Sequence, residues 1–237
     1  MLAMHAYEER EDKPSATVED YLHAIYSLQG EGETVISARL ARRMRVTPPT
    51  AWAIVQRMVR DGLITLDEKK VIHFTEKGHR LAEEIVRRHR LSERFLTDVL
   101  GFSWAEAHEE AHRFEHALSE RMEERIVALL GNPKTCPHGS PIPGSGYSHP
   151  PDLVSLSSLR EGDEAAVVFI SEELEEDLEL LRYLERGRIM PGQLLRVQEV
   201  VPATGVIVVE VDGQVVPLGL KVAQRIRVRL CQDGRPS

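Results

Sequence analysis

Residues 47–75 read TPPTAWAIVQRMVRDGLITLDEKKVIHFT, and this stretch decides the fold of the first third of the chain. Thr47 followed by Pro48 predicts the start of a helix, because a hydroxyl caps free N–H groups and proline at the first helical position loses no hydrogen bond. Gly62 predicts the end of that helix. Two short apolar runs follow, and the charged tip at residues 67–70 joins them into a hairpin. The stretch therefore predicts a helix and then a small β-hairpin.

Two further helices are expected upstream. Thr17 caps the first, whose apolar positions follow a helical period as far as Leu28. The second is short and spans residues 37–44. Helix, short helix, tight turn, helix and hairpin is the order of a winged helix-turn-helix domain, which we expect over residues 1–75.

The charge of the chain is unevenly spread. The 237 residues carry a net charge of −8, yet residues 36–60 hold six arginines and no acid. An acid-free basic window suits a polyanionic partner. A solvated helical face that is rich in arginine is the alternative interpretation.

The middle segment, residues 76–135, predicts two antiparallel helices. Thr75 caps the first, and Ser103 with Glu106 forms a capping box for the second, which we expect to run unbroken over residues 104–130. Two helices bury little surface alone, so the segment favours a dimer.

A Pro-rich linker is expected at residues 136–152, where five of the 13 prolines lie. Residues 153–231 are β-rich, with five strand-like runs, a hairpin turn at residues 212–213 and an acidic helix that begins after Ser171. Such short strands predict a small barrel. The fold class is therefore mainly α, with small β parts.

Composition excludes several classes of protein. No apolar run approaches the roughly 18–20 residues that cross a bilayer, and the N-terminus is acidic where a secretory signal is apolar. Cys136 and Cys231 lie far apart, which rules out a disulfide framework. We expect a cytoplasmic protein without a membrane partner.

Histidines and carboxylates recur at helical spacing on three predicted helices. Within each group the residues share one helix face. The groups are Asp20 with His23; His89 with Glu93; and His108, His112, Glu115 and His116. A lone histidine on a helix usually has a structural role, but the joint spacing of imidazoles and carboxylates favours a first-row divalent cation.

Residues 112–116 also match H-x-x-E-H, a metalloprotease pattern in which the glutamate is the general base. A pattern of five residues is weakly specific, and the chain has no sizeable catalytic domain. We therefore expect no enzymatic activity, with a metallopeptidase as the remote alternative.

Five motifs carry a resemblance to a known family: TVEDYL at 17–22, MVRDGL at 58–63, RHRLSER at 88–94, HEEAHRFEH at 108–116 and CPHGSPIPG at 136–144. Together they resemble the diphtheria-toxin-repressor and manganese-transport-regulator (DtxR/MntR) family of metal-dependent transcriptional repressors. The resemblance implies a homodimer that binds a palindromic operator in double-stranded DNA. It also implies a third domain, over residues 153–231, that is SH3-like (FeoA-like).

The resemblance further implies two metal sites and a DNA-binding surface. The primary site would use Asp20, His23, His112, Glu115 and His116. The ancillary site would use His89, Glu93 and His108, with Glu176 or Asp177 from the third domain. The DNA-binding residues would be Arg39, Thr47, Pro48, Pro49, Thr50, Trp52, Arg57 and Arg60.

The donor atoms indicate which metal is sensed. Iron-type members of the family carry methionine and cysteine where this chain has Asp20 and His112. A nitrogen and oxygen donor set without sulfur fits Mn(II), with Fe(II) second, while Zn(II), Co(II) or Cd(II) can substitute in vitro. We expect a Mn(II)-responsive repressor of metal-uptake genes. The alternative is a winged-helix regulator of another signal with structural histidines.

Overall fold

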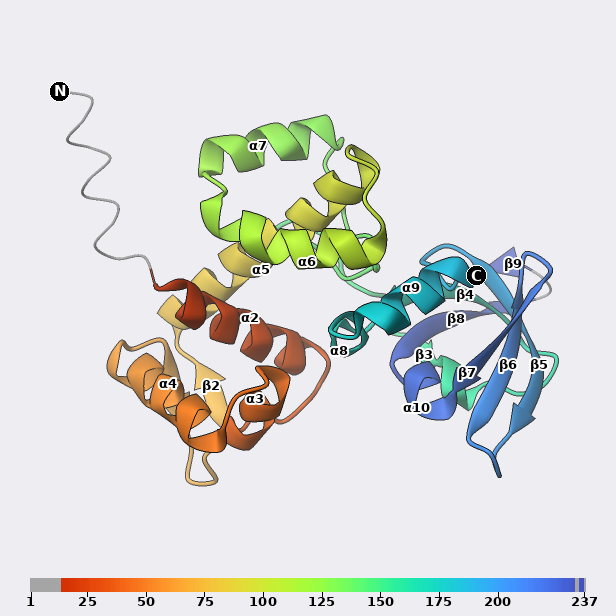
Figure 1. The fold of residues 1–237 in the computed structure, drawn as a ribbon, viewed down its shortest axis with the longest axis horizontal. Helices are drawn as coiled ribbons and strands as arrows, with labels where there is room; N and C mark the ends of the chain where they lie inside the picture. Colours follow the sequence, from red (N-terminus) through yellow and green to blue (C-terminus); the bar gives the residue numbers. More distant parts are fainter. Residues whose placement is uncertain (1–13, 233–234, 237) are drawn as a thin grey trace. The chain divides into compact units, whose positions relative to one another are not determined.

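In this computed structural model residues 14–232 and 235–236 are described. They form two compact units that meet in the sequence between Val86 and Arg87 (Figure 1). Every helix among the described residues is too short or too polar to cross a bilayer.

The first unit is a winged helix-turn-helix domain. Its elements in order are α2 (Ala16–Gly30), α3 (Ser37–Arg43), α4 (Pro48–Arg60), β1 (Ile64–Leu66), β2 (Ile72–Phe74) and the start of α5 (Glu76–Asp98). The two strands pair antiparallel, with Ile64 opposite Phe74. The predicted order of elements is therefore confirmed.

Local signals set the ends of these helices. The Thr47 hydroxyl accepts a hydrogen bond from the backbone N–H of Thr50 at the start of α4, and Thr75 does the same for Gly78 at the start of α5. The prediction that Thr17 caps the first helix is wrong, because α2 begins at Ala16 with Ser15 in the cap position. The Ser15 carbonyl accepts the first backbone hydrogen bonds, from Val18 and Glu19.

The second unit begins with the rest of α5 and continues through α6 (Trp104–Phe114), a 3₁₀ turn (Glu115–Ala117) and α7 (Glu120–Leu129). The capping box at Ser103 is present. The single helix expected over residues 104–130 is wrong. Leu118 is extended and buried, and the Ser119 hydroxyl caps α7 by accepting from the Met122 N–H at 3.3 Å.

The remainder of the second unit is built on a sheet. Its elements are β3 (Val154–Ser155), a 3₁₀ turn (Leu156–Ser158), β4 (Glu164–Ile170), α8 (Glu172–Glu175), α9 (Leu178–Arg186), β5 (Leu194–Val201), β6 (Val206–Val211), β7 (Gln214–Gly219), α10 (Leu220–Ala223), β8 (Ile226–Gln232) and β9 (Arg235–Pro236). Neighbouring strands in the sheet pair antiparallel. Asp212 and Gly213, with φ of 51° and 79°, form the tight turn between β6 and β7.

Two expectations for this region need correction. The strand order in the described residues is β3-β8-β4-β5-β6-β7, with β9 beside β8, so the sheet has two free ends and the expected barrel does not close. The acidic helix after Ser171 is two helices, because Asp177 accepts hydrogen bonds from the N–H groups of Glu179 and Leu180 and starts α9.

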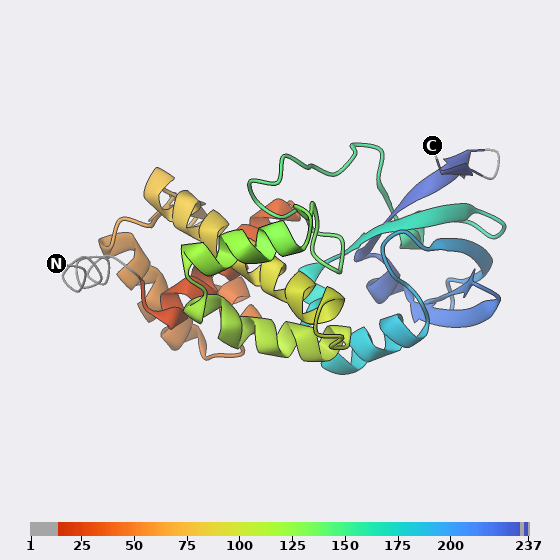
Figure 2. The ribbon, with the colours of Figure 1, turned by 90° about the horizontal axis from the view of Figure 1, so that it is seen from above.

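Helix α6 and the sheet share one core. Trp104 and Ala105, at the start of α6, belong to the buried cluster formed by the strands and α9. Helix α6 lies against α9, as Figures 1 and 2 both illustrate. The helical and β-rich parts of the second unit are therefore packed together.

The Pro-rich stretch consists of turns and loop segments without helix, as predicted, but it is more than a spacer. Three arginines of α5 donate to backbone carbonyls in this stretch or next to it: Arg87 to Pro143, Arg90 to Pro141 and Arg94 to Thr135, the residue before the stretch. On its other side the Ile170 N–H donates to the carbonyl of His138 at 2.9 Å. This segment therefore joins α5 to β4.

Gly139 makes that junction possible. Its φ is +96°, and a Cβ atom there would lie 2.2 Å from the carbonyl oxygen of Val168. Only glycine combines this backbone conformation with so close an approach of two chains.

Candidate metal centre and nucleic-acid interface

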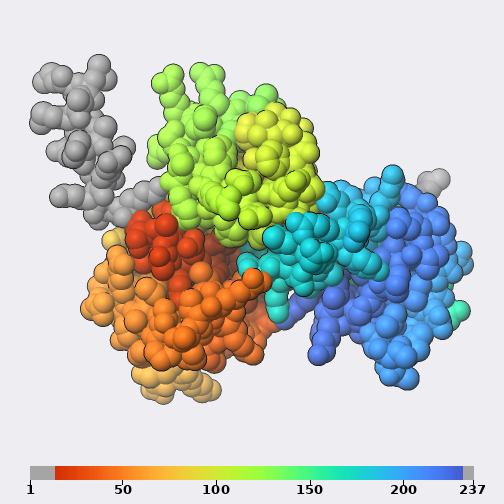
Figure 3. Space-filling view, viewed as in Figure 1, coloured from red at the N-terminus to blue at the C-terminus, as the bar shows by residue number. Residues whose placement is uncertain are grey.

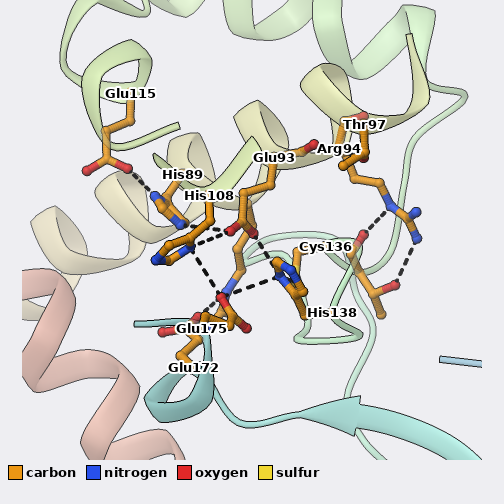
Figure 4. A network of polar contacts seen from close by, with 12 residues as sticks. His89, Glu93, Arg94, Thr97, His108, Glu115, Cys136, His138, Glu172 and Glu175 are labelled. Atoms are coloured by element: carbon orange, nitrogen blue, oxygen red, sulfur yellow. Dashed lines mark hydrogen bonds and ion pairs between the residues drawn. The ribbon is translucent and has the colours of Figure 1, made fainter. Parts of the chain in front are cut away.

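A buried cluster of imidazoles and carboxylates lies inside the second unit (Figure 4). His89 and Glu93 are one turn apart on α5, and their side chains are 3.2 Å apart, from Nε2 to Oε1. His108 on α6 places Nδ1 3.0 Å from the same Glu93 oxygen. On its other side, His89 Nδ1 lies 2.5 Å from Oε2 of Glu115. The predicted residues His89, Glu93 and His108 are thus brought together.

The linker and the third domain complete the cluster. His138 Nδ1 lies 3.4 Å from Oε2 of Glu175 on α8 and 3.6 Å from Oε2 of Glu93. The Cys136 sulfur lies 4.0 Å from the same His138 nitrogen. Trp104 meets the His138 ring edge-on, with ring centroids 4.6 Å apart. Glu93, Cys136 and His138 can each offer one donor atom within 4.8 Å of the others.

Opposite charges lie close together in this buried region. Burial opposes a charged imidazole, but Glu175 and Glu93 outweigh burial and raise the pKa of His138 to about 9. Burial also opposes ionisation of Glu93, yet His89 and His138 hold the pKa of that carboxyl well below its usual range. Burial and the charge of Glu93 raise the pKa of the Cys136 thiol to about 12. The thiol is therefore protonated at neutral pH in the absence of a cation.

Several polar atoms of the cluster have no hydrogen-bond partner. Within the described part of the chain, three buried atoms neither accept nor donate a hydrogen bond: Oε2 of Glu93, Oε1 of Glu175 and Nε2 of His138. Buried polar atoms are nearly always paired, so three such atoms in one cluster need an additional partner. A divalent cation held by carboxylate, imidazole and thiolate fits this donor set.

The two acids expected at the ancillary site, Glu176 and Asp177, lie in different surroundings. Asp177 is exposed, and its Oδ1 caps α9, so the structure does not bring it to the cluster. Glu176 is half-buried and lies near His108 and His112. Glu175 is the third-domain carboxylate that reaches His108 and His138, at 3.6 and 3.4 Å.

Sequence reasoning missed Cys136, His138, Glu172 and Glu175 as candidate ligands or partners. The signal for the first two was present, because a cysteine and a histidine two residues apart in a constrained loop are both metal-binding side chains. The signal for the glutamates was weak, since six acids follow one another in residues 172–179 and only tertiary packing selects among them.

The residues expected at the primary site fall in both units. Asp20 and His23 lie one turn apart on α2, in the first unit. His112, Glu115 and His116 lie in the second unit, where α6 passes into the 3₁₀ turn. Glu115 is buried beside His89, and the His112 ring lies 4.7 Å from the His89 ring.

The predicted DNA-binding residues lie on an open surface of the first unit. Residues 47–50 at the start of α4 are all exposed, and Trp52 is 40% exposed. The opposite face of α4 is buried through Ala51, Val55 and Met58. In Figure 3 the orange segment that includes α4 lies at the molecular surface. The N-terminal end of α4 is therefore exposed enough to enter a groove on the surface of a macromolecular partner.

The three predicted arginines differ in their surroundings. Arg39 pairs with Glu33, and Arg57 lies 3.6 Å from Asp61. Arg60 is exposed, and no ion pair joins its side chain to another described residue. Arg60 is thus the most available of the three for a phosphate.

Together, the fold and the cluster define a winged-helix protein with a buried group of imidazole, carboxylate and thiol side chains of the kind that can hold a cation. Three family models match consecutive parts of the chain: the N-terminal DNA binding domain of iron dependent repressors at residues 13–72, their metal binding and dimerisation domain at 75–144, and the FeoA domain at 154–230.

Curated relatives match over most of their length. The iron-dependent repressor IdeR of Mycobacterium tuberculosis (strain ATCC 25618 / H37Rv) is 39% identical over 222 residues, which is 90% of this chain and 96% of the relative. The diphtheria toxin repressor of Corynebacterium glutamicum is 34% identical over 220 residues, 90% of this chain and 95% of the relative.

Solved structures of metal-binding repressors also align with most of this chain. A manganese-dependent transcriptional repressor in complex with manganese aligns with a TM-score of 0.79 at 37% identity, covering 90% of this chain and all of the other. ScaR with bound Cd²⁺ aligns with a TM-score of 0.74 at 32% identity, covering 91% and 99%.

The chain belongs to the DtxR/IdeR family of metal-dependent transcriptional repressors. It is a DNA-binding, metal-dependent repressor with a dimerisation domain, and it is not an enzyme. The metalloprotease interpretation of residues 112–116 is therefore rejected.

Proposed function

We propose that this repressor responds to Mn(II), with Fe(II) as the second metal, and controls metal-uptake genes in the cytoplasm. The observation that carries the proposal is the donor set at the expected primary site, which offers nitrogen and oxygen and no sulfur. Hard and borderline donors of this kind suit Mn(II), whereas methionine and cysteine ligands select softer ions. The solved manganese complex of a repressor at 37% identity supports this choice.

The primary ligand set in the proposal is Asp20 and His23 from α2 with His112, Glu115 and His116 from the second unit. When bound, the cation supplies a common anchor for side chains of the DNA-binding and dimerisation domains. It must bind the DNA-competent arrangement more tightly than others, and the gain in DNA affinity is bounded by that difference.

The ancillary site is the buried cluster of the second unit. Glu93, Cys136, His138 and Glu175 are its proposed ligands, with His89 and His108 beside them and Glu176 near His108. Asp177 is left out because it caps α9. The Cys136 thiol must lose its proton to bind a cation, so occupancy of this site should release protons and favour ions that accept sulfur.

The three-domain division, with boundaries near residues 75 and 152, is part of the proposal.

The DNA side of the proposal uses two copies of α4. A homodimer presents them with two-fold symmetry, so a palindromic operator with half-sites about one helical turn or a multiple apart is expected. Thr47, Pro48, Pro49, Thr50 and Trp52 would approach base edges, while Arg39, Arg57 and Arg60 would neighbour phosphates.

The test is a DNA-binding titration of the metal-free protein with Mn(II), Fe(II), Zn(II) and Co(II) in parallel. Glu115→Ala or His116→Ala should abolish metal-activated binding, because each removes a ligand. Glu109→Ala is the matched control, since this exposed glutamate of α6 pairs only with Arg113 among its described neighbours. Full metal-dependent binding by Glu115→Ala would overturn the ligand assignment.

A second arm tests the metal preference. Asp20→Met with His112→Cys introduces the sulfur ligands of the iron-type relatives. The midpoint for Mn(II) should rise relative to the midpoints for Fe(II) and Co(II). An unchanged order of the four metals would reject the donor-set argument.

A further inference from the structure

The outward face of the first two turns of α4 is apolar. Pro48, Pro49 and Ala53 are exposed, and Trp52 keeps 40% of its surface exposed. The helix already buries its opposite face in the core of the first unit. The exposed part of the Trp52 indole therefore adds nothing to that core and is available to a partner.

The surroundings of this apolar face are basic. Residues 36–60 hold six arginines and no acid, and Arg60 on the same helix is exposed. An apolar protein surface does not need such an excess of positive charge, whereas the phosphates that border a groove of duplex DNA do. Charge complementarity therefore selects duplex DNA as the occupant of this face.

The first turns of α4 carry few groups that can read a base by hydrogen bonds. Residues 48–55 include no Arg, Lys, Asn or Gln, the side chains that pair bidentately with guanine or adenine. The hydroxyls of Thr47 and Thr50 share a hydrogen bond at 2.8 Å, and the Thr47 oxygen also accepts from the Thr50 N–H. The first amide, Gln56, comes one turn after Trp52 and is half-buried. Apolar contact is the principal means of base recognition that this face offers.

Among the four unmodified bases, only thymine presents an apolar group in the major groove, its C5-methyl. We propose that Trp52 is a specificity-determining residue that contacts the C5-methyl group of one thymine in each half-site of the operator. The inference rests on the proposed function, in which α4 approaches base edges, and it adds the base feature that is read there. A half-site with thymine at that position should be bound more tightly than one with deoxyuridine, which lacks only the methyl group.

The probe is a duplex recovered from random DNA by in vitro selection with the full-length wild-type protein and Mn(II). Each thymine of one half-site is replaced singly by deoxyuridine, and binding is measured by fluorescence anisotropy. At one position the replacement should weaken binding by about fourfold, the value expected for one methyl-sized group withdrawn from water. If no position responds to the loss of its methyl group, the proposal is wrong.

A protein variant assigns the methyl contact to Trp52. Trp52→Ala should bind the thymine and deoxyuridine duplexes equally, because the methyl group has lost its apolar partner. Arg60→Ala is the comparison variant, since loss of a phosphate contact should weaken binding to both duplexes to the same degree and keep the fourfold ratio. Persistence of that ratio in Trp52→Ala would assign the methyl group to another residue and overturn the proposal.

The readout is protected against a loss of folded protein. The ratio compares two duplexes with one protein preparation, so an inactive fraction does not change it. Thermal unfolding verifies the fold of each variant. Trp52→Gln, which keeps a long side chain, gives the same test and should also lose the ratio.

Failure of this inference and failure of the proposed function give different results. If the selection recovers no preferred duplex with Mn(II), nor with Fe(II), Zn(II) or Co(II) in parallel, the proposed function fails and this inference fails with it. If a duplex is recovered and the wild type binds its thymine and deoxyuridine forms alike, the proposed function stands and only the role of Trp52 is rejected.

Discussion

Arg90 on α5 donates from both Nε and Nη2 to one carboxylate oxygen of Glu172 on α8, at 3.0 and 2.7 Å. The two residues are 82 positions apart in the sequence, and both side chains are buried. Arg90 also donates to the carbonyl of Pro141. One guanidinium thus holds together the long helix, the Pro-rich stretch and the third domain beside the buried imidazoles.

Arg90→Met should lower the free energy of unfolding by about 3–5 kcal/mol, because it leaves the Glu172 carboxylate buried and without its cation. Urea unfolding of the metal-free protein measures this loss. Arg80→Met is the control, since Arg80 forms an exposed pair with Glu76 on the same helix and such pairs contribute little. Equal stability of the two variants would mean that the Arg90 pair is as weak as a surface pair.

Gly139→Ala should destabilise the protein by more than the about 1–3 kcal/mol expected of backbone strain alone, because the new Cβ would also meet the Val168 carbonyl. Gly146→Ala isolates the strain, since Gly146 has a φ of +70° but no atom within 4 Å of its Cβ position. The thermal midpoints of the two variants provide the comparison. Similar midpoints would contradict a close approach at residue 139.

His149 should make stability depend on pH between about 6.5 and about 4. Burial, and then the charge of Arg90, lower the pKa of His149 from 6.5 to about 4 in the folded protein. The unfolded chain therefore binds a proton more readily, and the free energy of unfolding should fall as the pH drops through this window.

His149→Phe tests this linkage, because phenylalanine preserves the stack on Phe169, whose ring centroid lies 4.1 Å away. The variant should lose stability less steeply than the wild type on acidification. His73→Phe, at an exposed histidine, controls for the removal of an imidazole as such. Identical pH profiles for His149→Phe and the wild type would show that this residue does not contribute to the acid sensitivity.

Arg60→Ala should weaken binding to all DNA sequences to a similar degree and reduce the slope of log affinity against log salt by about one unit, as expected for one lost phosphate contact. Fluorescence anisotropy at several salt concentrations measures the slope. Arg80→Ala provides a control at an arginine outside the basic window. A change in sequence preference at constant slope would place Arg60 at a base edge.

Short-range signals carried most of the fold prediction. A capping hydroxyl before proline at Thr47, the box of Ser103 with Glu106, and Asp212-Gly213 each act within four residues, so the sequence alone reveals them. The break at Leu118 was not predicted because the apolar period continues through it. Burial of Leu118 beside Leu91 and Ile126 favours the extended residue there.

The residues of the candidate site could be predicted only where they lie one turn apart along a single helix. His89 with Glu93 and His108 with His112 have the spacing of one turn, and the structure brings these helices together. Cys136 and His138 come from a loop, and Glu175 comes from the β-rich part of the second unit. These side chains approach one another because Gly139 lies against β4 and because Arg90 donates to Glu172 and to the Pro141 carbonyl. Both contacts join segments that are far apart in the sequence.

The position of Trp104 restricts how this chain can be altered by recombination. Because this residue of α6 completes a core otherwise formed largely by the strands and α9, residues from 153 onward cannot be exchanged for those of a relative as a free-standing cassette. A chimaera joined within residues 145–152 would inherit a mismatched surface unless residues near Trp104 were transferred with the strands. A crossover before residue 104 preserves the packing of Trp104 against the strands. Helix α6 and the sheet should therefore be transferred together as one segment.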